Sequence, residues 1–114
     1  HYTRDRVKGE KIPLEFLVRK QTKETAETFG LMDRGQIKEG YMADINIIDH
    51  ENLCVYKPEM VHDLPTGSRR IIQKAGGYIA TIKSGVVTFK NDEATGELPG
   101  TVLRGERTAE AISA

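Results

Sequence analysis

Cysteine is nearly absent from this sequence. Cys54 stands alone among 114 residues, so the chain has no internal disulfide framework. A single cysteine beside Val55 is typical of a small, buried hydrophobic side chain. With no disulfide framework to indicate an oxidising compartment, we expect a cytoplasmic protein.

Long apolar runs and an excess of charge of one sign are absent as well. No apolar stretch approaches the roughly 20 residues that a transmembrane helix needs, so we expect no membrane partner. The 17 basic and 17 acidic residues cancel, and no arginine-rich patch alternates with aromatic residues. This balance gives no indication of nucleic acid binding. The length predicts one domain with a modest core.

The first 30 residues predict one or two helices. Residues 1–11 are rich in charge and poor in apolar anchors, so we expect a loose segment or a short frayed helix. Pro13 suits the first turn of a helix, and apolar residues then recur with helical spacing. Thr22 is a suitable N-cap. We therefore expect a helix from about Pro13 to Gln21, a kink at Thr22 and a second short helix to Phe29.

The stretch Gly30–Asp49 predicts the passage from helix to sheet. Gly30 is the residue type that most often ends a helix in the left-handed conformation. Two turns, Asp33–Gly35 and Lys38–Gly40, flank a short edge strand expected at Gln36–Ile37. The apolar, β-branched centre of Ala43–Asp49 then predicts a mostly buried strand.

The following segment carries little periodicity. We expect residues 51–67 to form a long loop, with a short strand near Leu53–Tyr56. Loops of this length in a compact domain are commonly functional or disordered. Residues 69–74 predict a strand that Gly76-Gly77 interrupts.

A hairpin is the clearest feature of the second half. Residues 78–83 and 86–90 are separated by Ser84-Gly85, which suits a primed two-residue turn. Asn91-Asp92 predicts another turn, and residues 106–114 predict a disordered tail. The predicted fold class is α+β: one or two N-terminal helices followed by a small, mostly antiparallel β-sheet.

Several positions together resemble one superfamily. The pattern resembles the stretch in which amidohydrolase-superfamily enzymes return from the catalytic barrel to a flanking β-sandwich, and its positions are Gly30-Leu31, Asp33-Arg34-Gly35, Ile37, Gly40, Ala43-Asp44 and Asp49. Three flanking segments are similar to the C-terminal end of N-acyl-D-amino-acid deacylases, which are family-three amidohydrolases: HYTRDRVKGEKIPLEFLVRKQT, MVHDLPTGSRRIIQ and GVVTFKNDEATGELPGTVLRG. The resemblance covers roughly residues 1–105.

This resemblance implies a domain organisation. Residues 1–30 would be the final helical segment of a (β/α)8 barrel, and residues 31–105 the C-terminal part of a composite β-sandwich. Because that family is several times longer, the resemblance implies a C-terminal fragment whose partner is the remainder of the parent hydrolase. A piece of a sandwich exposes sheet edges and apolar surface, so we also expect self-association.

The resemblance also implies a reaction. The parent would hydrolyse C–N amide bonds of N-acyl (D-)amino acids with a water activated by metal, and zinc is the expected ion. The family binds metal through a His-x-His pair and later histidines, whereas His1, His50 and His62 lack that spacing. The family's catalytic aspartate precedes the segment similar to His1–Arg6. We therefore expect a non-catalytic, structural portion with neither a metal site nor a cofactor of its own.

Three alternatives remain open from the sequence alone. The chain could instead be a stand-alone α+β module for binding or oligomerisation, without an enzymatic parent. His62 and Asp63 either lie near the substrate at the barrel mouth or form a turn ahead of Pro65. Arg69, beside Arg70, either binds a carboxylate or flanks a strand. The residues with a structural role are predicted to be Gly30, Asp33, Gly35, Gly40, Asp44 and Asp49, and the two later aspartates should bind local backbone N–H groups.

Overall fold

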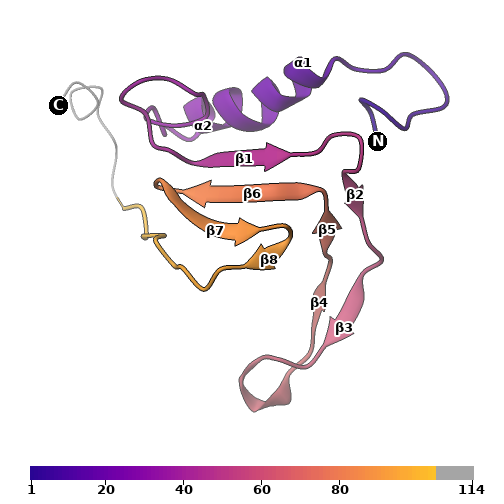
Figure 1. Cartoon of the computed structure of the whole chain (residues 1–114), viewed down its shortest axis with the longest axis vertical. Coiled ribbons are helices and arrows are strands. Elements are labelled where there is room, and N and C mark those ends of the chain that lie inside the picture. The colour runs from indigo at the N-terminus through magenta and orange to yellow at the C-terminus, as the bar shows by residue number, and fades with distance from the viewer. Residues whose placement is uncertain (105–114) are drawn as a thin grey trace. The chain divides into compact units, whose positions relative to one another are not determined.

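A computed structural model describes residues 1–104, and the predicted tail 106–114 lies outside this range (Figure 1). The chain divides into two compact units, which are described separately below. Unit 1 is His1–Asp44 with the described residues from Thr101 onward, and unit 2 is Ile45–Gly100. Helix occurs in unit 1 and small antiparallel sheets in unit 2, which confirms the predicted α+β class.

The helix of unit 1 changes its hydrogen-bonding pattern around Thr22, where a kink was expected. It consists of α1 (Leu14–Arg19), the π-helical segment η1 (Lys20–Glu24) and α2 (Thr25–Thr28). The prediction of an N-cap at Thr22 is wrong, because its hydroxyl donates a hydrogen bond to the Val18 carbonyl at 2.7 Å. A threonine that bonds back to the preceding turn lies inside the helix, and such bonding often bends the helix slightly.

Gly30 ends this helix as predicted. Its φ of 70° is left-handed, and its N–H donates to the Glu27 carbonyl at 3.0 Å. The N–H of Leu31 reaches the Ala26 carbonyl at 2.8 Å. These two bonds form a Schellman motif, which satisfies carbonyl groups that the helix end would otherwise leave unpaired.

The loop after the helix folds back onto it at Gly35. With φ at 90°, this glycine lies so close that a Cβ would stand 2.8 Å from the Thr22 carbonyl oxygen and 2.9 Å from the Lys23 Cα. The predicted edge strand at Gln36–Ile37 is wrong, since neither residue belongs to a strand and Ile37 is 88% exposed. The loop is closed instead by the Met42 N–H, which donates to the Asp33 carbonyl at 2.8 Å.

The N-terminal segment forms a hydrogen-bonded loop and no helix. The N–H groups of Asp5 and Arg6 both donate to the His1 carbonyl, at 3.0 and 2.9 Å. The Ile12 N–H donates to the Tyr2 carbonyl at 3.0 Å and brings the two ends of the loop together. The expected loose or frayed segment therefore has a defined turn structure.

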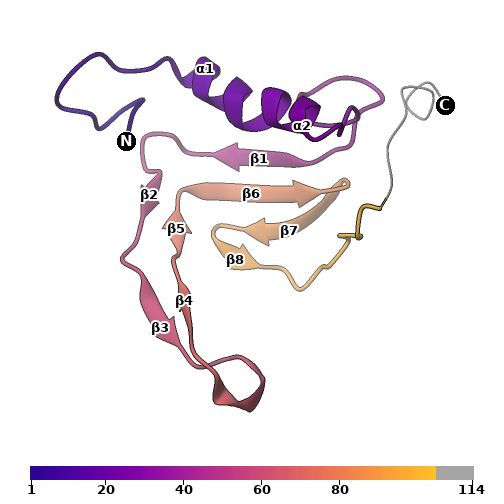
Figure 2. The same cartoon turned by 180° about the vertical axis from the view of Figure 1, so that it is seen from behind.

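A four-stranded antiparallel sheet forms the larger part of unit 2, with order β1-β6-β7-β8 (Figure 2). Its strands are β1 (Ile45–Ile48), β6 (Tyr78–Lys83), β7 (Val86–Lys90) and β8 (Glu93–Ala94). The β6–β7 hairpin is confirmed, because Ser84 and Gly85 both have positive φ, as a type I′ turn requires. Asn91 and Asp92 likewise have positive φ and join β7 to β8.

The prediction that the first strand is mostly buried is wrong. In β1, Asn46 and Ile47 are exposed, and Ile45 and Ile48 are only half-buried. β1 pairs with β6 alone, and the other strands of unit 2 that the structure describes provide no layer over it. The apolar residues of β1 thus form a strand face that the other described strands of unit 2 do not cover.

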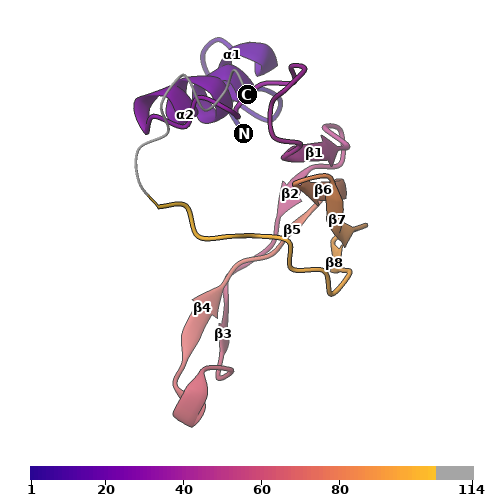
Figure 3. The ribbon, with the colours of Figure 1, turned by 90° about the vertical axis from the view of Figure 1, so that its left-hand side faces the viewer.

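The segment between β1 and β6 is a two-stranded ribbon, which we define as residues 53–77 (Figure 3). Near the sheet, β2 (Cys54–Val55) pairs with β5 (Ala75–Gly76). Farther out, β3 (Glu59–Val61) pairs with β4 (Arg70–Ile72), and a 3-10 turn, η2 (Pro65–Gly67), closes the tip. The predicted strand near Leu53–Tyr56 is present, but the expectation of a long loop over 51–67 is wrong, because β3 finds its partner in β4.

Apolar side chains are poorly enclosed in both units. Among residues 1–104, Ala26 is the one apolar side chain that is buried, and no large side chain is fully buried. Val7, Leu98 and Ile37 are 94%, 93% and 88% exposed. The modest core that the length predicts is therefore absent from the described residues, and many large apolar side chains are exposed.

No helix within residues 1–104 combines the length and the apolar character that crossing a membrane demands.

Candidate functional site

The three candidate residues, His62, Asp63 and Arg69, lie at the outer end of the ribbon. Of these three, Asp63 forms a hydrogen-bonded ion pair. The Asp63 carboxylate accepts two hydrogen bonds from Arg70, at 2.7 Å from Nε and 2.6 Å from Nη2. Within the described residues, neither His62 nor Arg69 makes a hydrogen bond or ion pair with Asp63. The arginine that binds a carboxylate bidentately here is Arg70 and not the candidate Arg69, and the carboxylate belongs to the ribbon itself.

The Asp63–Arg70 pair fixes the ribbon tip. The Arg70 guanidinium holds the pKa of the Asp63 carboxyl below its ordinary value of 3.8. In return, the hydrogen-bonded Asp63 carboxylate raises the pKa of Arg70 above its ordinary value. Both side chains are about half exposed, so solvent screens the pair, and we assign it a local role in shaping the tip.

This pair predicts a specific pH dependence of the ribbon. A carboxyl whose pKa is lowered on folding stabilises the folded state above its ordinary pKa, and this contribution is lost as the pH falls through the lowered value. Amide exchange at the ribbon tip, followed by NMR, should therefore accelerate relative to β6 and β7 below about pH 4. Asp63→Asn should remove this dependence, whereas an unchanged profile in that variant would contradict the assignment.

The aspartates of the Gly30–Asp49 stretch have structural partners. Asp33 is 8% exposed, and its carboxylate lies 3.0 Å from Arg34 Nε. Arg34 Nη1 also lies 3.5 Å from the Asp44 carboxylate, so one guanidinium bridges both ends of the loop. Asp49 binds local N–H groups as predicted, since its carboxylate accepts from the Asn52 backbone N–H and side-chain amide at 3.3 and 2.7 Å.

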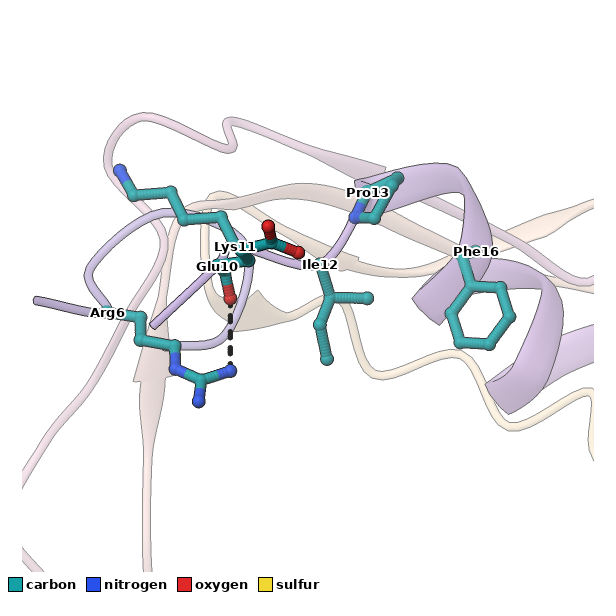
Figure 4. Close-up of a pocket in the computed structure, with 6 residues that line it drawn as sticks. All are labelled: Arg6, Glu10, Lys11, Ile12, Pro13 and Phe16. Carbon is teal, nitrogen blue, oxygen red and sulfur yellow. Dashed lines mark hydrogen bonds between the residues drawn. The ribbon is translucent and has the colours of Figure 1, made fainter. Parts of the chain in front are cut away.

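One cavity of unit 1, of about 570 Å³, is open to solvent (Figure 4). It is lined by Arg6, Glu10, Lys11, Ile12, Pro13 and Phe16. The Arg6 guanidinium extends toward the chain itself and donates to the Glu10 carbonyl at 3.1 Å and to the Lys8 carbonyl at 2.7 Å. It also lies 5.8 Å from the centre of the Tyr2 ring. The guanidinium N–H groups of Arg6 therefore stabilise the N-terminal loop.

Another cavity, of about 450 Å³, lies in unit 2, where the inner end of the ribbon meets the sheet. It is lined by Tyr56, Lys74, Ala75, Tyr78, Thr81, Phe89 and Asp92. None of these residues was predicted to line a binding site. No motif connects them, because they come together only through the pairing of β2 with β5 and of β6 with β7.

The described residues do not form a metal centre. Within residues 1–104, no group of three or more His, Cys, Asp or Glu side chains is placed to hold an ion. His1 lies at the start of unit 1, His50 follows β1 and His62 follows β3.

Comparison with known proteins decides the family. Residues 2–89 match the model of the amidohydrolase family. The chain belongs to the amidohydrolase family. This amidohydrolase-family chain is also 35% identical, over 103 residues, to the D-aminoacylase of Alcaligenes xylosoxydans xylosoxydans. The match covers 90% of the chain and 19% of that protein, so the chain spans about a fifth of its relative's length.

No solved structure matches this amidohydrolase-family chain significantly. The predicted relation to amidohydrolases and D-aminoacylases is thus confirmed on sequence similarity.

Proposed function

We propose that this chain is the non-catalytic, C-terminal structural portion of a metal-dependent amidohydrolase that hydrolyses the C–N amide bond of N-acyl D-amino acids. The observation that carries the proposal is the 35% identity to a D-aminoacylase over 90% of the chain. Residues 1–30 would complete a catalytic barrel, and residues 31–105 would complete a β-sandwich beside it.

The exposed apolar side chains support a scaffolding role. Phe29 is 76% exposed at the end of the helix, and Ile71 and Val55 in the ribbon are 67% and 68% exposed. A two-stranded ribbon by itself is only marginally stable in water, and large exposed apolar residues favour burial against another surface. The remainder of the hydrolase is the partner we propose for these surfaces, and self-association is the consequence we expect in its absence.

The chemistry would come from that remainder. Zinc bound there would lower the pKa of a water molecule and polarise the amide carbonyl, as in other metal-dependent hydrolases. The role of this chain would be to support the barrel wall near the metal, because small displacements of positioned catalytic groups are costly. We propose the cytoplasm as the site of the reaction, in keeping with the single cysteine.

A chimera tests this proposal. The matching fifth of the Alcaligenes xylosoxydans xylosoxydans D-aminoacylase is replaced with this chain, and release of free amino acid from N-acetyl-D-leucine is measured with zinc supplied. We expect a soluble, active enzyme, because the transplanted segment would provide the same packing surface. The separate 114-residue chain should show no hydrolysis and should sediment as concentration-dependent oligomers.

Two results would count against the proposal. A chimera that is folded and binds zinc, yet shows no hydrolysis above that of the truncated relative, would mean that this segment cannot support the barrel. A separate chain that remains monomeric at high concentration would mean that its apolar surface needs no cover.

A further inference from the structure

The unit 2 cavity combines aromatic walls with two opposite charges. Its rings come from Tyr56, Tyr78 and Phe89, while Lys74 brings an ammonium group and Asp92 a carboxylate. Ligand sites in proteins commonly join apolar walls to a few polar groups that fix the orientation of the ligand. This composition therefore suits a small molecule with an apolar body and both signs of charge.

The Asp92 carboxylate is held firmly in place. Both central residues of its turn, Asn91 and Asp92, have positive φ, and the carboxylate oxygens accept the backbone N–H groups of Gly77 and Tyr78 at 3.2 and 3.1 Å. A carboxylate has about four acceptor positions, so two remain for a ligand. No ion pair within residues 1–104 neutralises its charge, which favours an ammonium group there.

The Asp92 carboxylate is close enough to Tyr56 to affect the pKa of its hydroxyl. A hydrogen bond with Cys54 raises the pKa of Tyr56 above its ordinary value of 10.0, and the negative charge of Asp92 raises it further. Because the hydroxyl stays protonated, the Tyr56 ring presents an uncharged aromatic surface next to Asp92. A cation with an apolar body gains from both neighbours.

Lys74 is available for an anionic group. Its Nζ lies 3.7 Å from Glu59 Oε1, and the two side chains are 69% and 56% exposed. An exposed pair of this length contributes little to stability, so the ammonium group can turn toward a ligand at small cost.

We propose that this cavity binds a free α-amino acid with an apolar side chain. The ligand's ammonium group would bind Asp92, its carboxylate would bind Lys74, and its side chain would pack against the aromatic rings. The inference deepens the proposed function and rests on it in one respect, since hydrolysis of an N-acyl amino acid releases such a molecule. The site would let the structural portion sense the product of the reaction.

Three ligands of one shape test the charge pattern. Leucine, 3-methylbutylamine and 4-methylpentanoate share an apolar body, but the amine lacks the carboxylate and the acid lacks the ammonium group. Isothermal titration calorimetry of each with the chimera, using both enantiomers of leucine, should show at least one enantiomer binding at least tenfold more tightly than either single-charge analogue.

Lys74→Gln separates this cavity from any site in the barrel. The variant should weaken leucine binding about tenfold and leave 3-methylbutylamine unchanged, because only the carboxylate contact is lost. Lys90→Gln is the matched control: Lys90 lies on β7, is exposed and does not line the cavity, so leucine binding should not change.

Binding is measured whether or not the chimera hydrolyses its substrate. Lys74-dependent leucine binding in an inactive chimera would support this site and count against the proposed function. Equal affinity of the two lysine variants and the unaltered chimera for leucine, or equal affinity of the three ligands, would overturn the proposed site even in an active enzyme.

Discussion

Gly35→Ala is expected to weaken the helical part of unit 1 by about 3 kcal/mol. The left-handed conformation at this position costs a residue with a Cβ about 1 to 2 kcal/mol. The added methyl group would also stand 2.8 Å from the Thr22 carbonyl oxygen, and overpacking of this kind costs about 1 to 3 kcal/mol. Hydrogen exchange of the Leu14–Thr28 amides, measured by mass spectrometry on the chimera, reports this loss directly.

Gly40→Ala is the matched control for this prediction. Gly40 has φ of 82°, close to the 90° of Gly35, but a Cβ built there meets no atom within 4 Å. The control therefore carries the conformational cost without the clash and should accelerate exchange far less. Equal effects of the two substitutions would mean that the loop does not press against the helix at Gly35.

Arg34→Leu is expected to destabilise the same unit by about 2 to 4 kcal/mol. The side chains of Arg34 and Asp33 are 15% and 11% exposed, so their charges are largely removed from water. Replacing the guanidinium with an apolar group takes a cationic partner from a buried carboxylate, and such changes are strongly destabilising. Thermal unfolding and soluble yield of the chimera measure the effect.

Arg4→Leu provides the comparison for Arg34→Leu. Arg4 binds the adjacent Asp5 through the same Nε–carboxylate contact, at 2.6 Å, but this pair is more exposed, at 28% and 51%. Exposed ion pairs contribute little, so the variant should unfold at nearly the unaltered temperature. If the two substitutions had the same effect, burial of the Asp33–Arg34 pair would not be what stabilises the loop.

Local features were predictable from the sequence, whereas features that depend on distant partners were not. Gly30 and Ser84-Gly85 determine their own backbone conformation, so the helix end and the hairpin turn were correctly placed. The pairing of β3 with β4 joins segments that lack strong alternation, and a sequence pattern alone gives no register for them. The N-cap prediction at Thr22 failed because a threonine side chain can either cap a helix N-terminus or donate a hydrogen bond to the preceding turn.

The candidate site was likewise predictable only in its local features. The sequence placed Asp63 and a carboxylate-binding arginine in one region, but the choice of Arg70 over Arg69 depends on register. Val61 lies opposite Arg70 across the ribbon, which brings that side chain near Asp63. The aromatic residues and charges of the unit 2 cavity come from strands β6 and β7, from the Asn91-Asp92 turn and from two separate positions in the ribbon, so no local sequence pattern places them together.

The ribbon leaves the sheet and returns to it at one point. Ile48 pairs with Tyr78, and the Asp49 N–H donates to the Gly77 carbonyl at 2.8 Å. A Cβ on Gly77 would stand only 2.8 Å from the Leu53 Cα, so the outgoing and returning backbones touch there. Because the two ends of the ribbon already meet, the ribbon can change in length or composition without disturbing β1 and β6. Sequence differences among related hydrolases can thus accumulate in the ribbon while β1 and β6 keep their pairing.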